Sequence, residues 1–148
     1  MTLMDAKEYD DAGARRRKIR IITIIGTLMV LGFLVYQFRF WPQERLVDKF
    51  FAALEKQDYS TAYGIYRADP DWKQHPQQHA DYPYNEFYQD WGPGGEWGLI
   101  KSYKIYASGE CPKGGSGVIV EVIVNNRSEH EQLYVQKSEK TFSPSPCS

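Results

Sequence analysis

Apolar residues follow one another without a break in the first part of the chain, and further along they recur at regular intervals. Residues 21–38 include no charged side chain. As a helix this stretch would span roughly 27 Å, close to the thickness of a membrane's hydrocarbon core. It is apolar all round and not along one stripe, which is typical of a lipid-facing helix. We therefore predict a transmembrane helix over residues 19–41, which makes the lipid bilayer its partner.

The residues that flank this apolar stretch indicate how it is used. Residues 36–43 are bulky and aromatic, with no small-residue cleavage site, so we expect an uncleaved signal anchor. Five basic residues lie within positions 15–20, against three spread over positions 39–49. The excess of positive charge predicts a cytoplasmic N-terminus and a C-terminal part on the far side. We expect residues 1–18 to form a disordered cytoplasmic tail.

Beyond residue 41 the apolar positions change to helical and then to strand spacing. Helical spacing predicts helices over 44–57, 60–67 and 83–91, with a polar loop over 69–81. Strand patterns cover 99–107, 118–125 and 132–141, and the middle one is apolar on both faces except at Glu121. Two prolines within 143–146 should end the ladder, which leaves 143–148 as a tail. We predict a single extracytoplasmic α+β domain over 42–142, with helices on one face of a curved antiparallel sheet.

The chain has two cysteines, Cys111 and Cys147, and both lie in the part expected outside the cytoplasm. They follow the first and third predicted strands, whose ends share one edge of an antiparallel meander. The residues allow either a disulfide or two thiols, and we expect the disulfide.

The segment from Val47 to Tyr63 combines an apolar helix, a Gln-Asp turn and a second helix that contains Ala62 and Tyr63. It resembles the opening of the nuclear transport factor 2-like superfamily, in particular small bacterial membrane-anchored members of unknown function. The resemblance implies a cone-shaped roll with a pocket between helices and sheet, and a bacterial inner membrane with the domain periplasmic or extracellular. No residue here matches the catalytic carboxylate and acid of the isomerase relatives, and one strand signal is missing.

Aromatic residues make up 15% of the chain, including 11 tyrosines, so a pocket would be lined by rings with polar edges. Tyr82 and Tyr106 are further candidates for its mouth. Glu121, the one charged residue of the middle strand, is a candidate carboxylate of the pocket. Alternatively, it pairs with Lys101 or Lys137 across the ladder. The net charge of −1 argues against a nucleic-acid partner. The ligand-binding candidates are Tyr84, Tyr88, Trp91, Tyr103 and Glu121.

Two other patterns carry candidate chemistry. Asp90-Trp91 and Glu96-Trp97 flank a glycine-rich turn, and such a set could serve as general acid and base or as a platform for a sugar. The simpler explanation is a core position for Trp91 and exposed acids. His75 and His79 have the spacing of metal ligands on a helix, but Pro76 favours a solvated loop. We predict no metal and no cofactor.

Three functions remain open. We expect a non-enzymatic accessory or scaffold domain that binds a partner protein or a small apolar ligand at the membrane surface. The second hypothesis is an isomerase or hydrolase with Asp90, Glu96 or Glu121 as base. The third is a structural envelope protein that forms a homodimer through its sheet.

Overall fold

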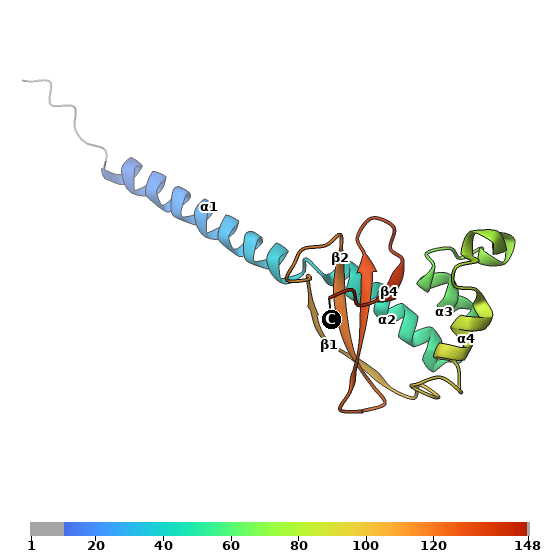
Figure 1. Cartoon of the computed structure of the whole chain (residues 1–148). Helices are drawn as coiled ribbons and strands as arrows, with labels where there is room; N and C mark the ends of the chain where they lie inside the picture. Colours follow the sequence, from blue (N-terminus) through green and yellow to red (C-terminus); the bar gives the residue numbers. More distant parts are fainter. Residues whose placement is uncertain (1–10, 148) are drawn as a thin grey trace, which may run out of the picture. The chain divides into compact units, whose positions relative to one another are not determined.

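The computed structural model describes residues 11–147 (Figure 1). The chain divides into two compact units, Met1–Arg39 and Phe40–Ser148.

The first unit contains one long helix, α1 (Asp11–Gln37), none of whose residues is buried. It is long and apolar enough to span a membrane. Residues 11–18, for which we predicted disorder, are helical, and the rest of the predicted tail lies outside the described residues. Alanine and basic residues have high helix propensity, and Asp11 in the first turn complements the helix dipole, so the helix extends beyond its apolar part.

Helix α1 ends at Gln37, four residues before the predicted end of the membrane segment. The guanidinium of Arg39 lies 3.8 Å from the Tyr36 ring and donates to the Tyr36 carbonyl (3.0 Å), one of the carbonyls that a helix end leaves unbonded. The next helix, α2, begins at Trp41 with Pro42 in its first turn, where a missing N–H costs nothing.

The second unit is α+β, as predicted. The helices are α2 (Trp41–Glu55), α3 (Tyr59–Tyr66) and α4 (Tyr84–Trp91), and two short 3-10 helices, η1 (Trp72–Gln74) and η2 (Pro76–His79), occupy the predicted loop. The strands are β1 (Tyr103–Gly109), β2 (Gly117–Val124), β3 (His130–Gln136) and β4 (Phe142–Pro144). Helix α2 contacts both β1 and β2 and runs along one face of the sheet (Figure 1).

The sheet is antiparallel with strand order β1-β2-β3-β4, so it has four strands and not three. The predicted strand 132–141 is interrupted by a turn in which Lys140 has a φ of +59°. Ser143 and Pro144, which we expected in the tail, pair with Tyr134 and Leu133. Proline is tolerated there because β4 is an edge strand, whose outward N–H positions need no partner.

Strand β2 lies inside the sheet, but only one of its faces is fully covered. Four valines, Val118, Val120, Val122 and Val124, are completely buried against the helices. Ile119, Glu121 and Ile123 alternate with them and are partly exposed on the outer face. The apolar character of both faces therefore does not mean that both are buried.

Aromatic rings dominate the core between sheet and helices. Phe50 of α2 is fully buried, and its ring meets five others at centroid distances between 5.0 and 6.1 Å. These rings come from α2, α3, α4 and β4, and they are Phe51, Tyr66, Phe87, Trp91 and Phe142. Most of the pairs meet edge to face or tilted, the arrangement that ring quadrupoles favour.

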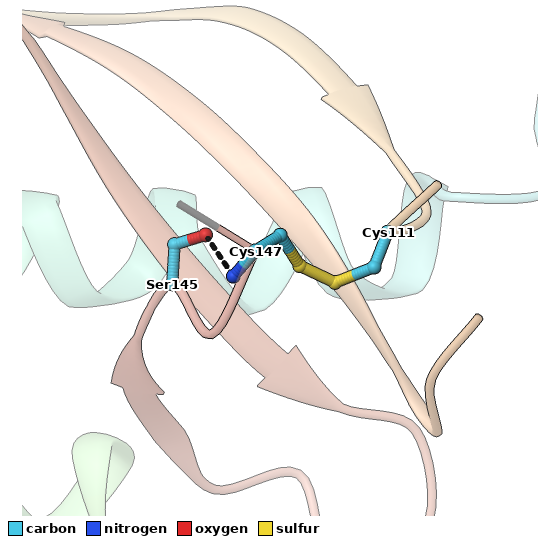
Figure 2. The surroundings of a disulfide bond; sticks show 3 residues. All are labelled: Cys111, Ser145 and Cys147. Atoms are coloured by element: carbon cyan, nitrogen blue, oxygen red, sulfur yellow. Dashed lines mark hydrogen bonds between the residues drawn. A yellow bond between two sulfur atoms is a disulfide. The ribbon is translucent and has the colours of Figure 1, made fainter. Parts of the chain in front are cut away.

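Cys111 and Cys147 are joined at disulfide distance, with Cα atoms 5.7 Å apart, so the predicted pairing agrees with the structure (Figure 2). The predicted place of Cys147 in the fold was wrong, because this residue follows β4 and not β3. Tyr134 points to the outer face, yet it is buried, and it lines a small cavity together with both cysteines. A Cβ on Gly117 would overlap the Tyr134 ring, so this glycine makes room for it.

Replacing both cysteines with serine should lower the free energy of unfolding by about 3 to 4 kcal/mol, because the cross-link closes a loop of 36 residues in the unfolded chain. Urea unfolding with and without reductant measures this. Reductant should destabilise the original chain by the same amount and leave the double variant unchanged. Equal stability of the two proteins without reductant would contradict a formed bond.

Candidate functional site

A groove of about 780 Å³ lies in the second unit, between the ends of α3 and α4 on one side and β3 and β4 on the other. Five buried side chains supply its apolar surface: Tyr66, Trp91, Trp97, Leu133 and Phe142. Its polar lining includes Arg67, Asp81, Tyr82, Asp90, Glu96 and Glu131. The groove thus combines a floor of rings with walls that carry four carboxyl groups.

Glu131 lies in β3, which forms one wall of the groove. Its side chain points to the inward face of the sheet, as do those of Leu133 and Val135. The indole Nε1 of Trp97 donates to its Oε2 at 2.6 Å. Burial raises the pKa of Glu131, the charge of Glu96 acts in the same direction, and the hydrogen bond from Trp97 opposes both. Glu131 is therefore a carboxyl group held inward next to a large ring.

A second carboxyl group belongs to Asp90 at the end of α4. The hydroxyl of Tyr82 donates to its Oδ2 at 2.7 Å. Burial, reinforced by this hydrogen bond, raises the pKa of Tyr82 well above its usual range. Burial also raises the pKa of Tyr66 to about 12. Both tyrosines are neutral at physiological pH, and the hydroxyl of Tyr82 is therefore a hydrogen-bond donor.

Arg67 is the one cation among the groove's lining residues, and it is engaged by neighbours. Its two terminal nitrogens donate to the Asp81 carboxylate at 2.7 and 3.2 Å, and Nε donates to Nδ1 of His79 at 3.2 Å. Because Nδ1 of His79 accepts, its Nε2 carries the proton and donates to Asp69 (2.8 Å). Hydrogen bonds from His79 and His75 lower the pKa of Asp69.

This network replaces the solvated loop that we expected around the two histidines. His79 is buried, and His75 Nδ1 lies 3.0 Å from the same Asp69 oxygen. Within residues 11–147 no group of three or more His, Cys, Asp or Glu side chains could hold a metal ion.

The turn between β2 and β3 holds the segment that carries Trp97. Asn125 has a φ of +51°, as a tight hairpin turn requires. Its amide donates to the carbonyls of Trp97 (3.2 Å) and Leu99 (2.9 Å) and accepts from the N–H of Lys101 (2.7 Å). The guanidinium of Arg127 donates to the Glu96 carbonyl at 2.9 Å. One wall of the groove is thus anchored by side chains from the hairpin.

Of the predicted ligand-binding residues, Trp91 lines the groove, and so does Tyr82, which we expected at the pocket mouth. Tyr106, the other residue expected there, is exposed beside His130 and does not line it. Tyr84 stacks on Trp72 (centroids 4.8 Å apart), and Tyr88 is exposed beside Tyr59. The Tyr103 hydroxyl donates to Asp48 of α2 at 2.9 Å. The structure does not bring these three tyrosines together into one site.

Glu121 points to the outer face of the sheet, away from the groove. Its partner is Nδ1 of His130 (2.5 Å), so the expected lysine pairing is wrong. Lys137 pairs with Glu110 instead. Glu121 prefers the histidine because His130 lies diagonally next to it on the same face of β3.

The second set of candidates does meet in the groove, since Asp90, Glu96 and Trp97 all line it with Trp91. Sequence reasoning missed most of the other lining residues, among them Tyr66, Arg67, Glu131, Leu133 and Phe142. Glu131 could have been found, because it alternates in phase with the apolar Leu133 and Val135 and so belongs to the inward face.

Comparisons with protein-family models, with curated proteins and with solved structures gave no match. The resemblance to the nuclear transport factor 2-like superfamily therefore stays a prediction.

Replacing Asn125 with glycine should lower the free energy of unfolding by roughly 1 to 2 kcal/mol, because the positive φ is kept while the side-chain hydrogen bonds are lost. Asn126 also has a positive φ (+56°) and provides the matched control. Replacing it with glycine should change stability by less than about 0.5 kcal/mol. Urea unfolding measures both, and equal effects would show that only backbone conformation matters.

Glu131 should make stability depend on pH. Its raised folded-state pKa means that the folded chain binds this proton more tightly than the unfolded chain, so its contribution is favourable below the unfolded pKa and is lost as pH rises through the folded pKa. We expect Glu131→Gln to unfold at higher urea than the original chain near pH 7, and this advantage to shrink below about pH 4. A destabilised variant at neutral pH would contradict this, and Glu129→Gln in the exposed turn is the control.

Proposed function

We propose that this protein is a membrane-anchored extracytoplasmic binding domain, which holds a small ligand with apolar and polar parts in the groove and acts as an accessory or scaffold at the membrane surface. The observation that carries the proposal is the groove itself, with rings on its floor and carboxyl groups in its walls. Its volume lies within the about 300–1,000 Å³ of typical small-molecule sites, and a few placed polar groups beside rings are their usual lining.

The membrane anchor is supported by the surface of α1. The apolar side chains of α1 are exposed all round the helix, because none of them is buried by another part of the described chain. A continuous apolar surface of this kind is typical of a helix that contacts lipid. The basic residues before it favour a cytoplasmic N-terminus, and the cysteine pair suits an oxidising compartment outside the cytoplasm. We propose the inner membrane of a bacterium, with the second unit in the periplasm or outside the cell.

A nuclear transport factor 2-like roll is also part of the proposal. It is supported by the α2–α3 segment, whose sequence carries the resemblance, and by helices that cover one face of an antiparallel sheet. The sheet has four strands, which supplies the strand that the sequence pattern lacked.

The second candidate function is an enzyme with a carboxylate base, and one observation favours it. Glu131 is held inward, and burial raises its pKa, which is the usual preparation of a carboxyl group for proton transfer near neutral pH. Glu131 would be the base in this case, because it is the inward carboxyl group of the groove. Of the bases expected from the sequence, Asp90 and Glu96 also line the groove, whereas Glu121 lies on the outer face.

Topology can be tested in bacterial cells. Alkaline phosphatase fused to the C-terminus should be active, because that enzyme folds only outside the cytoplasm, and the fusion should resist extraction from membranes at alkaline pH. A matched fusion without residues 21–38 should be inactive and soluble. An active fluorescent protein in place of the phosphatase, or full release at alkaline pH, would contradict the proposed topology.

Ligand binding can be tested with the indole signals of a ¹⁵N-tryptophan-labelled chain. Trp91 and Trp97 line the groove, whereas Trp41 and Trp72 lie elsewhere and serve as internal controls. A set of small aromatic compounds of different charge should include at least one that shifts the signals of the groove pair alone. If no compound shifts them, the binding function is wrong.

A further inference from the structure

The charges around the groove indicate the chemical class of its ligand. Four carboxyl groups line it against a single guanidinium, and that guanidinium is bound to one of the four, Asp81. The remaining three belong to Asp90, Glu96 and Glu131. No cation among the lining residues pairs with these three, although the guanidinium of Arg127 lies beside Trp97 outside the groove. The lining therefore carries more negative than positive charge over a floor of rings, and such a surface attracts positive charge.

We propose that the groove selects an organic cation, meaning an ammonium or guanidinium group carried by a small molecule with an apolar or ring-bearing part. This inference rests on the proposed binding function and names the ligand class for the same site.

Glu131 is the group against which the positive charge would lie. The indole N–H of Trp97 donates to Oε2 and holds the carboxylate in place, so its negative charge has a fixed position in the wall. Burial raises the pKa of Glu131, and the negative charge of Glu96 acts on it in the same direction. A cation between them relieves this repulsion and offsets the cost of a partly buried carboxylate. A neutral polyol would donate hydrogen bonds to the carboxylates but leave the repulsion in place.

The rings of the floor favour the same ligand class. The faces of tryptophan and tyrosine rings attract cations, and the attraction grows where water is excluded. Trp97 already has the guanidinium of Arg127 at 5.3 Å from its ring centroid, so this indole interacts with positive charge within the protein itself. The Tyr82 ring is partly exposed and its hydroxyl donates to Asp90, so this ring lies where an ammonium group next to Asp90 would meet it.

The experiment compares four probes on the full ¹⁵N-tryptophan-labelled chain. The probes are benzyltrimethylammonium, benzyl alcohol, phenylacetate and methyl glucoside. The micelle is a polyoxyethylene ether detergent, because maltoside headgroups would compete with the sugar and phosphocholine headgroups would compete with the cation. Shifts of the Trp91 and Trp97 indole signals give the affinity of each probe, with Trp41 and Trp72 as internal controls.

We expect benzyltrimethylammonium to bind at least about tenfold more tightly than the other three probes, which corresponds to about 1.4 kcal/mol. Glu131→Gln should weaken this cation by about tenfold and leave benzyl alcohol unchanged, whereas Glu129→Gln, with the same change in net charge outside the groove, should have no effect. If Glu131→Gln fails to fold, Glu96→Gln in the exposed turn serves the same purpose and should weaken the cation.

The outcomes separate the ligand class from the binding function. Equal binding of the cation and benzyl alcohol, or tighter binding of phenylacetate or methyl glucoside, would overturn the cation class while groove binding stands. If no probe shifts the Trp91 and Trp97 signals, both proposals fall. A cation effect that is equal in the Glu129→Gln and Glu131→Gln variants would also overturn the inference, because it would come from net charge and not from the groove.

Discussion

The packing of the Phe50 ring is the interaction on which the second unit depends. This ring lies at the point where α2, α3, α4 and β4 meet, and each of these elements contributes at least one aromatic ring to its surroundings. Edge-to-face contacts are directional, so the rings fix the relative positions of the elements more tightly than aliphatic packing would. Removing Phe50 would leave a void in contact with all four.

The groove is a direct consequence of this core. Tyr66, Trp91 and Phe142 each pack against Phe50 and also line the groove. The core surface and the floor of the groove are therefore formed by the same side chains. Because core rings sit in dense packing with few alternative rotamers, the floor is held in place before any ligand arrives.

The polar walls need support of a different kind. Glu131 is partly buried and would be costly without a partner, whereas Asp81 and Asp90 are exposed and need partners only to hold their positions. Each wall receives it from a separate segment. Tyr82 donates to Asp90, Trp97 donates to Glu131, and Arg67 bonds Asp81. The hairpin turn at Asn125 fixes the backbone of Trp97, so a side chain outside the groove controls the position of a group inside it.

Much of the local structure followed from the sequence because it depends on residues close together. The long helix and the central strand come from nearly continuous apolar runs, and the three amphipathic helices come from helical spacing within a few turns. The cysteine pairing was also predictable, since a count of two allows one intramolecular bond. The fourth strand was missed because Ser143 and Pro144 have low strand propensity, and only the open edge of β3 makes their pairing favourable.

The site depended on tertiary structure, and two glutamates show the reason. Glu121 and Glu131 both lie in inner strands, yet one faces outward to His130 and the other inward to Trp97. Side chains alternate between the two faces along a strand, so a shift of one residue would turn an inward glutamate outward and an outward one inward. Which residues face inward is decided by the apolar neighbours that must be buried. The sequence alone determined which elements form and which charges they carry. Only the packing of distant segments decided which of those charges share a groove.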